Sequence, residues 1–305
     1  MRAYRFDSFD SLDELRLREE PDPQPQRGEV LVRVRAVSLN FRDLAMLRGT
    51  YPRKCVPGLI PASDAAGDIV AVGEGVRALK VGDRVIGAFH PRWFGGEMPS
   101  TIASDSYGAE SDGWLCELKA ISQEAVVRLP EALSYEEACT LPCAGLTAWT
   151  ALTGPAPIRA GHSVLVQGSG GVSVFALQLA RAVGATVIAT TSSAAKAEQL
   201  KALGAAHVVN YVEEPEWGRQ VRALTAGRVE DDVGGDLLTA AQARERPVAA
   251  PLDPVDGLAE AEGDAEVAQV VLERLDDLAV AEVEHRRPRL DDRDPRAERG
   301  EHRRV

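Results

Sequence analysis

The sequence predicts an α/β protein, and three observations lead to this prediction. Residues 1–125 contain short runs of alternating apolar and polar residues separated by turn signals, which is typical of β-structure. Residues 163–190 contain two short apolar runs with a helical pattern between them, which predicts a βαβ unit. Residues 229–305 have a different composition. The fold class is therefore predicted from the first 228 residues.

Alternation of apolar residues predicts strands in the first part of the chain. Valines at every second position indicate a half-buried strand at residues 30–34. Residues 67–73 and 81–86 are predicted as two further strands, each beside a glycine turn. Residues 90–116 are rich in Gly, Ser and Pro and are expected to form a long loop. The pattern predicts an all-β first part.

A helical segment is expected to lead from the β-rich part to the βαβ unit. It covers residues 131–152, with breaks expected at Pro142 and Gly145. Residues 163–167 follow it and are short, apolar and β-branched, which is typical of a buried parallel strand. The βαβ unit is thus expected to begin at residue 163.

A glycine-rich turn separates this strand from a predicted helix at residues 172–183, which Gly184 can end. Residues 186–190 then read as the second strand, so the unit closes within about 30 residues. Bare glycines let a pyrophosphate approach the free N–H groups at a helix N-terminus. The alternative is an ordinary tight turn in an α/β sheet. The turn residues expected to bind a cofactor are Gly168, Gly170, Gly171, Val172 and Ser173.

Composition excludes several classes of protein. The formal net charge of −12 argues against non-specific nucleic-acid binding. The first twenty residues carry charges throughout, so no cleavable signal peptide is predicted. The uncharged window 160–180 is too rich in glycine and serine for a membrane span. The four cysteines have no C-x-x-C spacing, so no disulfide framework is predicted. We expect a cytoplasmic protein with no membrane partner.

The tail, residues 229–305, contains no Phe, Trp, Tyr, Ile, Met, Cys, Lys, Asn or Ser. Apart from Thr239, it uses only residues whose codons can begin with G or C. A GC-rich gene read out of frame has this property, so we hypothesise a frameshift at or just after Arg228. The alternative is a native acidic, disordered tail. Translation of the other reading frames past codon 228 would distinguish the two.

Several motifs in residues 1–228 resemble those of the medium-chain dehydrogenase/reductase superfamily. A Gly-x-x-Val-x-x-Gly-x-x-Val pattern spans residues 67–76, and Gly-Asp-x-Val follows at 82–85. Leu-Asn-Phe-Arg-Asp at 39–43 and Gly-Thr-Tyr-Pro at 49–52 are similar to the zinc-independent quinone oxidoreductase and enoyl reductase branch. The resemblance implies a β-rich chaperonin-10-like (GroES-like) domain followed by a Rossmann domain.

With this resemblance, residues 1–125 are expected to form the GroES-like catalytic domain. Residues 126–228 are expected to form the first half of a Rossmann NADP-binding domain. Residues 229–305 form the acidic tail outside the family pattern, so the Rossmann domain is predicted to be incomplete. The family commonly forms a homodimer through its last strand, and that dimer is in doubt here for the same reason.

The resemblance also implies that the site lacks zinc. In zinc-bearing relatives a Cys stands in place of Asn40, and His-Glu stands in place of Ser63 and Asp64. Only Cys143 matches a catalytic zinc-ligand position, and a single thiolate cannot hold the metal. The loop after His90 lacks the four cysteines of the structural zinc lobe. We therefore expect no metal, with Cys139 and Cys143 as small core residues.

The end of the second strand distinguishes between the two nicotinamide cofactors. An acidic residue there would bind a ribose hydroxyl, whereas this chain has Thr191 followed by Ser192, with Lys196 one turn further. Small hydroxyls and a cation suit a phosphate. The same Lys and Tyr spacing, here Lys196 and Tyr211, occurs in quinone oxidoreductases at the adenosine 2′-phosphate. NADP(H) is therefore predicted; alternatively or in addition, residues 191–193 cap the next helix.

Three further residues match functional positions of the family. Asn40 and Thr147 match positions that contact the nicotinamide ribose and phosphate side, although Asn40 could instead order a loop and Thr147 satisfy a helix backbone. Tyr51 is the candidate proton donor, since a phenol is neutral at pH 7 and needs no metal. Its alternative is packing against Pro52. Asp43 is expected to fix local structure.

The predicted function is zinc-independent, NADPH-dependent transfer of hydride to a quinone, an enone or a related carbonyl. The expected partner is a small-molecule substrate. The alternative is a catalytically inactive truncated relative, at most a nucleotide-binding module, because the second half of the Rossmann domain would lie in the altered tail. Titration with NADPH distinguishes the two.

Overall fold

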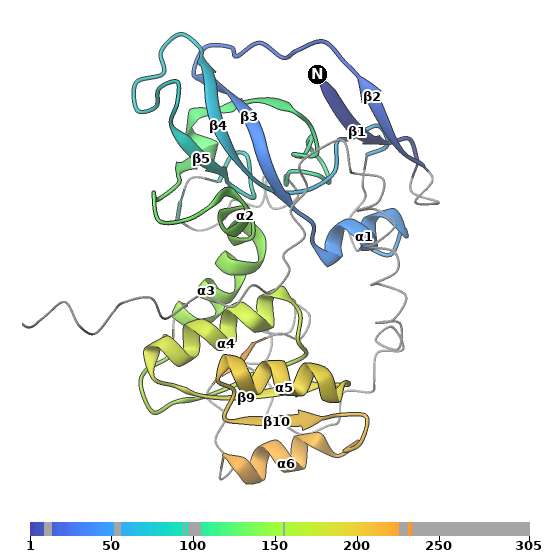
Figure 1. Cartoon of the computed structure of the whole chain (residues 1–305), viewed down its shortest axis with the longest axis vertical. Coiled ribbons are helices and arrows are strands. Elements are labelled where there is room, and N and C mark those ends of the chain that lie inside the picture. The colour runs from blue at the N-terminus through green and yellow to red at the C-terminus, as the bar shows by residue number, and fades with distance from the viewer. Residues whose placement is uncertain are drawn as a thin grey trace, which may run out of the picture.

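The computed structural model describes residues 1–8, 14–51, 56–93, 95–96, 105–154, 156–225 and 231–233. A β-rich unit comes first, then a helical connection and an α/β unit (Figure 1). Except for residues 231–233, the tail at 229–305 lies outside the described residues, so the frameshift and the disordered tail stay hypotheses. None of the helices in the described ranges has the length and apolar character needed to cross a membrane.

An antiparallel sheet in the order β6-β3-β4-β5-β7 forms the frame of the first unit. Its strands are β3 (Glu29–Ser38), β4 (Asp64–Val72), β5 (Arg84–Gly87), β6 (Leu118–Ser122) and β7 (Val126–Arg128), and the 3-10 turn η3 (Gln123–Ala125) precedes β7. A separate antiparallel pair consists of β1 (Arg2–Phe6) and β2 (Leu15–Glu19). The strands predicted at 30–34, 67–73 and 81–86 are confirmed as parts of β3, β4 and β5.

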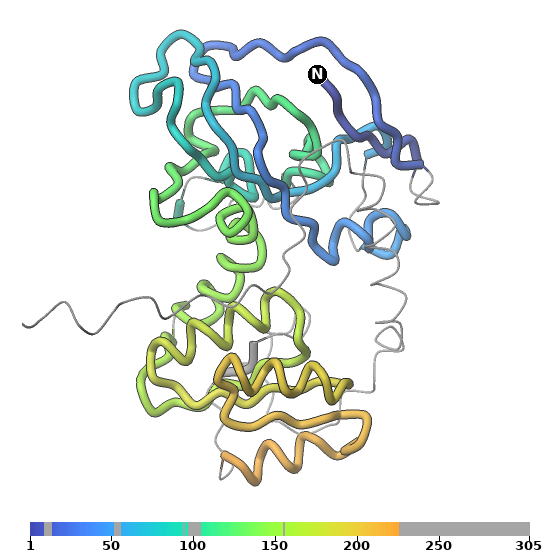
Figure 2. Tube along the Cα trace, in the orientation of Figure 1, coloured from blue at the N-terminus to red at the C-terminus, as the bar shows by residue number. Residues whose placement is uncertain are grey.

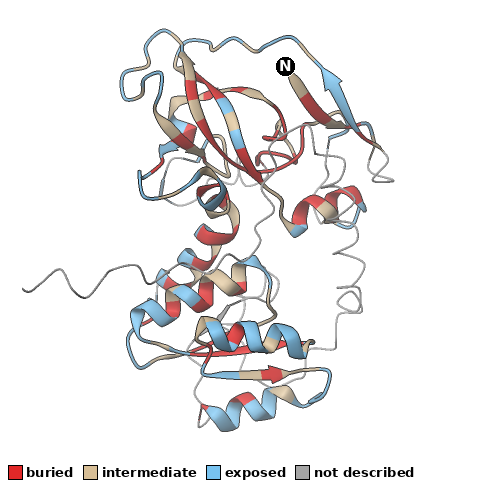
Figure 3. Cartoon of the chain, in the orientation of Figure 1, coloured by how far each residue is buried: buried red, intermediate tan, exposed pale blue. Residues whose placement is uncertain are grey.

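The core of this unit lies against β3 and β4, where buried positions are concentrated (Figure 3). The strict alternation predicted for β3 is wrong, because Leu31 is buried along with Val30 and Val32. The pairing of β3 with β4 shifts register between Leu31 and Val32. A bulge of this kind changes which face of the sheet a side chain reaches. β3 also pairs with β6 on its other edge, so it is a central strand.

A helix, α1 (Phe41–Leu47), interrupts the part of the chain that was predicted to be all β. Asn40 is its N-cap, and the Asn40 backbone amide donates to the Asp43 carboxylate at 2.7 Å. An acidic side chain three residues after the cap satisfies one of the orphan donors at a helix start. The Asn-x-x-Asp spacing carried this signal, and the expectation of a purely β first unit was wrong.

A left-handed residue precedes β4. Ala62 has a φ of 68°, which costs an L-residue about 1–2 kcal/mol. The loop at 105–116 packs closely against the Ala62 backbone, since a Cβ added to Gly113 would lie 2.2 Å from the Ala62 carbonyl oxygen. The Trp114 amide donates to that same oxygen at 3.0 Å. The loop at 105–116 therefore fixes the backbone that leads into Asp64.

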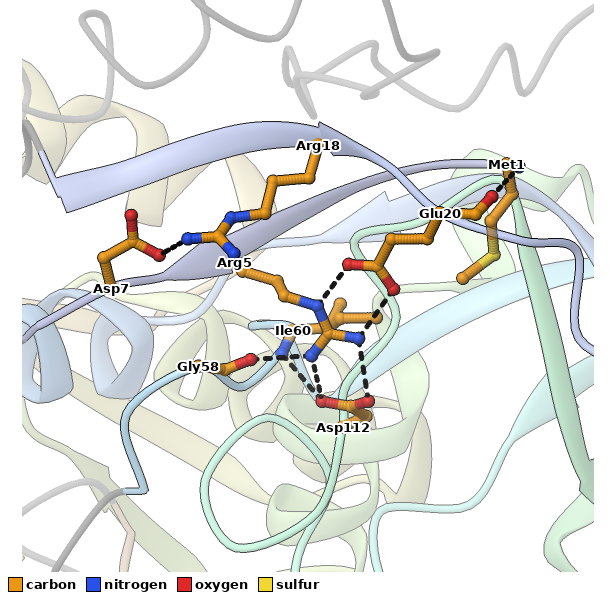
Figure 4. A network of polar contacts seen from close by, with 8 residues as sticks. All are labelled: Met1, Arg5, Asp7, Arg18, Glu20, Gly58, Ile60 and Asp112. Carbon is orange, nitrogen blue, oxygen red and sulfur yellow. Dashed lines mark hydrogen bonds and ion pairs between the residues drawn. The ribbon is translucent and has the colours of Figure 1, made fainter.

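An ionic network attaches the β1–β2 pair to this loop (Figure 4). The Arg5 guanidinium binds the Glu20 carboxylate with two N–H groups and reaches the Asp112 carboxylate at 3.0 Å. It also donates to the Gly58 carbonyl at 2.6 Å, while Asp112 accepts from the Ile60 amide at 3.0 Å. Hydrogen bonding to Arg5 lowers the pKa of Glu20. Four separate chain segments are joined by one guanidinium.

The connection between the units consists of α2 (Tyr135–Ala138), the π-helix η4 (Leu141–Gly145) and α3 (Leu146–Thr153). The break predicted at Pro142 and Gly145 is confirmed, because the α-helix is interrupted there: α2 ends at Ala138, and both residues lie in η4, which runs directly into α3. Pro142 is in the first turn of η4, where its missing N–H is not needed. The predicted helix at 131–152 begins only at Tyr135, after the Ser134 cap.

The second unit is a parallel sheet in the order β10-β9-β8-β11, which is the 3-2-1-4 arrangement of a Rossmann fold. Its elements are β8 (Ser163–Val166), α4 (Gly171–Val183), β9 (Thr186–Thr191), α5 (Ala194–Leu203), β10 (His207–Asn210), α6 (Trp217–Leu224) and β11 (Asp231–Val233). Figure 2 follows the chain from the connecting helices into this unit. The predicted βαβ unit is confirmed, and Gly184 ends α4 with a φ of 89°.

Strand β11 lies past residue 228, where the composition changes. Its residues 231–233 pair in parallel with residues 164–166 of β8. The described sheet therefore contains one strand beyond the three that the first half of a Rossmann domain supplies. Its position beside β8 creates the point at which the strand order reverses, where open α/β sheets bind ligands.

We predict that Gly113→Ala destabilises the protein by about 3 kcal/mol, because the new methyl would overlap the backbone at Ala62. Gly218→Ala is the matched control. Gly218 is in α6 with nothing within 4 Å of an added Cβ, so this change should stabilise by about 0.5 kcal/mol. Urea unfolding followed by circular dichroism measures both. Equal stability of the two variants would contradict the close contact at Ala62.

Candidate active and cofactor site

A buried carboxylate lies where the β-rich unit meets η4. Asp64, the first residue of β4, is 0% exposed. It accepts hydrogen bonds from the Ser63 hydroxyl (2.7 Å), the Asn40 side-chain amide (3.1 Å) and the Cys143 backbone amide (3.0 Å). Burial raises the pKa of Asp64 to about 6, although the three donors favour its ionised form. At pH 7 the group is mainly a carboxylate.

The carboxylate determines how Asn40 is oriented. An ionised carboxylate can only accept, so the Asn40 NH2 group faces Asp64 and its Oδ1 faces away. The Asn40 backbone amide is held separately by Asp43. Burial also raises the pKa of Asp43. Both the backbone and the side chain of Asn40 are thus held by acidic residues, which agrees with the expected structural role of Asp43.

The π-helix η4 lies between this carboxylate and the glycine-rich turn. The Cys143 amide binds Asp64, and a Cβ added to Gly171 in α4 would lie 3.4 Å from the Ala144 Cβ. Thr147 lies one helical turn after Cys143, in the first turn of α3. Contacts through η4 therefore connect Asn40, Thr147 and the glycine-rich turn, three of the predicted parts of the site. π-helical turns occur frequently at functional sites.

Tyr51 lies beside a buried guanidinium. The Arg42 side chain is over the Tyr51 ring, 5.5 Å from its centroid, and over the Phe89 ring at 4.6 Å. Arg42 also donates to the Ser106 hydroxyl at 3.0 Å and to the Tyr107 carbonyl at 3.1 Å. Its Nε has no hydrogen-bond partner among the described residues. The predicted contact partner Pro52 lies outside the described residues, so that alternative stays open.

The residues at the former zinc-ligand positions do not fit a zinc ion. Zinc requires deprotonated thiolate, imidazole or carboxylate donors with free lone pairs. Asp64 already accepts three hydrogen bonds, and Asn40 presents N–H groups, which cannot bind a metal, to the same space. Burial raises the pKa of the Cys143 thiol to about 12, so it stays protonated. Across the described ranges no three His, Cys, Asp or Glu side chains are grouped to hold a metal.

The glycine-rich turn has the geometry that a pyrophosphate needs. Gly168 follows β8 with a φ of 81°, and an added Cβ there or on Gly170 would meet nothing within 4 Å. No side chain of the described part of the chain caps α4, so its first-turn N–H groups are open to an anion. Ser173 occupies the place of the third glycine in the Gly-x-Gly-x-x-Gly pattern of dinucleotide-binding turns. It is buried, and its hydroxyl donates to the Gln167 carbonyl at 2.7 Å. The turn is therefore compatible with a dinucleotide.

The residues predicted for the adenosine end lie together at the carboxyl edge of the sheet. Thr191 ends β9, and its carbonyl accepts from the Tyr211 amide at 3.0 Å. Ser193 caps α5, accepting from the Lys196 amide at 3.4 Å, so the capping role is present. Ser192 and Lys196 are exposed, whereas the Thr191 side chain is buried. The exposed pair is the better placed for a 2′-phosphate.

Sequence reasoning missed two residues of this site. Asp64 was considered only as a replaced metal ligand, and Arg42 only as part of a motif. For Asp64 the signal was an acidic residue at the start of an apolar strand, Asp-Ala-Ala-Gly-Asp-Ile-Val, where a carboxylate needs donors. No signal in the sequence places Arg42 against Tyr51, because the contact depends on how the chain turns after α1.

Comparison with known proteins matches a family profile to each of the two units. The profile of the alcohol dehydrogenase GroES-like domain matches residues 26–131, and that of the zinc-binding dehydrogenase matches residues 171–239. A zinc-type alcohol dehydrogenase-like protein of Schizosaccharomyces pombe is 40% identical over 230 residues, 74% of this chain and 66% of that protein. A quinone oxidoreductase of Pseudomonas aeruginosa is 34% identical over 240 residues, 77% of this chain and 67% of that protein.

A solved structure shows the same fold. The quinone oxidoreductase of Escherichia coli complexed with NADPH superimposes with a TM-score of 0.64 at 28% identity, covering 78% of this chain and 68% of that one. The chain thus spans about two thirds of the length of the curated relatives just described. The match to the second profile continues through β11 to residue 239.

We predict that Asp64→Asn stabilises the protein more at pH 8 than at pH 4. The pKa of Asp64 rises from 3.8 to about 6 on folding, so its ionisation costs stability as pH rises through this range. The amide keeps an acceptor oxygen and carries no charge. The gain over wild type should be about 2 kcal/mol larger at pH 8. Urea unfolding of both proteins at the two pH values measures it, and a pH-independent difference would show that Asp64 ionises normally.

Proposed function

Because the chain belongs to the medium-chain dehydrogenase/reductase superfamily, we propose that it is a zinc-independent, NADPH-dependent oxidoreductase acting on a quinone, an enone or a related carbonyl. The observation that carries the proposal is the open glycine-rich turn between β8 and α4, with exposed hydroxyl and ammonium groups at the edge of the same sheet. The quinone oxidoreductases in the comparison are consistent with this substrate class.

The chain's own residues supply the cofactor contacts in this proposal. The first-turn amides of α4 receive the pyrophosphate, and Gly168 and Gly170 let it approach. Ser192 and Lys196 face the 2′-phosphate, since a hydroxyl and a cation both stabilise its charge. Asn40 and Thr147 hold the nicotinamide side. When bound, NADPH supplies a hydride to the substrate.

In this proposal Tyr51 donates a proton or a hydrogen bond to the anion that hydride transfer leaves on the substrate. A carbonyl or activated alkene that gains a hydride becomes an anion and needs a proton or a hydrogen-bond donor. The Tyr51 Oη holds such a proton without a metal. Arg42, over the Tyr51 ring, keeps the phenol in place and stabilises negative charge that develops on it.

The alternative, a catalytically inactive truncated relative that is at most a nucleotide-binding module, is favoured by the altered composition of residues 229–305. It predicts no oxidation of NADPH by a quinone such as 1,4-benzoquinone, and at most a saturable rise in melting temperature with NADPH. The oxidoreductase predicts both signals. The absence of both signals would contradict the oxidoreductase and support the inactive relative.

We predict that Lys196→Ala weakens NADPH binding about tenfold and leaves NADH binding unchanged, because only NADPH carries the 2′-phosphate. Lys201→Ala is the matched control. Lys201 lies in the same helix and pairs with Glu198 at 2.8 Å, so its removal should affect neither cofactor. Fluorescence titration measures the dissociation constants. An equal loss for both cofactors at Lys196 would argue against phosphate recognition there.

We predict that Tyr51→Phe lowers kcat with a quinone or enone about a hundredfold and leaves the Kd for NADPH unchanged. The ring and its contact with Arg42 are kept, and only the hydroxyl is lost. Tyr135→Phe is the control for the same chemical change, since the Tyr135 hydroxyl donates to Asp68 on β4. Steady-state kinetics measure kcat. An unchanged kcat in Tyr51→Phe would remove Tyr51 from the mechanism.

A further inference from the structure

We propose that Asp64 is a positioning residue for the nicotinamide end of the cofactor. Its carboxylate holds the Asn40 side chain and the η4 backbone in one arrangement, and this sets Asn40 relative to the glycine-rich turn. The inference rests on the proposed binding of NADPH. It assigns a ligand-binding consequence to a residue that touches no ligand itself.

One oxygen of Asp64 lies between the Asn40 side chain and the backbone of η4. Asp64 Oδ2 accepts from the Asn40 side-chain amide at 3.1 Å and from the Cys143 backbone amide at 3.0 Å. Within the described ranges, the other oxygen, Oδ1, accepts from the neighbouring Ser63 hydroxyl alone, at 2.7 Å. The positioning role therefore belongs to Oδ2, and the Ser63 contact is separable from it.

The far side of η4 completes the connection. Ala144, next to Cys143, lies against Gly171 at the start of α4, where the pyrophosphate is proposed to bind. Asn40 and the first turn of α4 are therefore connected through Asp64 Oδ2 and one turn of the η4 π-helix. A dinucleotide that spans the two is sensitive to that separation, whereas a ligand that reaches only α4 and α5 is not.

The start of β4 restricts where Asp64 can move. Ala62, two residues earlier, is held in a left-handed conformation by the loop that contains Gly113. Asp64 is 0% exposed, and three hydrogen bonds hold its carboxylate in place. A rigid backbone and a fully bonded carboxylate are the requirements for a residue that sets a distance.

The test compares NADPH with adenosine 2′,5′-bisphosphate, which has the adenosine and both of its phosphates but no nicotinamide end. Dissociation constants of the full-length wild type, Asp64→Ala, Asp64→Asn and Ser63→Ala are measured by titration calorimetry. We expect Asp64→Ala to lose about tenfold in NADPH affinity and to keep its affinity for the bisphosphate. Asp64→Asn keeps an acceptor oxygen for Asn40 and Cys143 and should bind like wild type, as should Ser63→Ala.

Other outcomes overturn the inference in distinguishable ways. If Asp64→Ala loses affinity equally for both ligands, Asp64 is only a structural residue. If Asp64→Ala loses affinity for neither ligand, Asp64 does not position Asn40 for the nicotinamide end of the cofactor. The same conclusion follows if wild type binds NADPH no more tightly than the bisphosphate. If wild type binds neither ligand, the proposed function itself fails. Asp64→Ser, whose hydroxyl is too short to reach Asn40, replaces Asp64→Ala if circular dichroism shows that Asp64→Ala is unfolded.

Discussion

The structure depends on one constraint, which is that a buried carboxylate must be hydrogen-bonded wherever it lies. Asp64 meets this requirement with donors from three elements that are far apart in the sequence: the α1 cap at Asn40, its own neighbour Ser63 and the π-helix at Cys143. Leaving one of these donors unpaired in the interior would cost free energy. The β-rich unit and the connecting helices are therefore joined at a polar point, at the position where metal-bearing relatives would place a zinc ligand.

The second unit has its own requirement, since a parallel sheet exposes the carboxyl ends of its strands at one edge. β8 leads into the glycine-rich turn, β9 ends at Thr191 and β10 ends at Asn210, just before Tyr211, so the residues proposed for the phosphates lie along one edge. β11 adds a neighbour to β8 and produces the reversal of strand order beside the turn. The η4 helix then brings this edge toward Asn40, because its Ala144 packs on Gly171.

Periodicity and turn chemistry were sufficient for the regular elements. The βαβ unit at 163–190 was predicted nearly to the residue, because a buried parallel strand and an amphipathic helix have distinct periods and glycines end both. The same reasoning predicted a break at Pro142 and Gly145, and the π-helix η4 lies there between α2 and α3. It failed at α1 because the Asn40 and Asp43 cap was read only as part of a family motif.

By itself, the sequence determined the α/β class and the position of the glycine-rich turn, because these depend on residue types and local spacing. Only the tertiary structure decided that Asp64 is fully buried, that it binds Asn40 and Cys143, and that Arg42 covers Tyr51. Those contacts join residues up to 79 positions apart. No local pattern encodes them, since burial and pairing follow from how the packed elements meet.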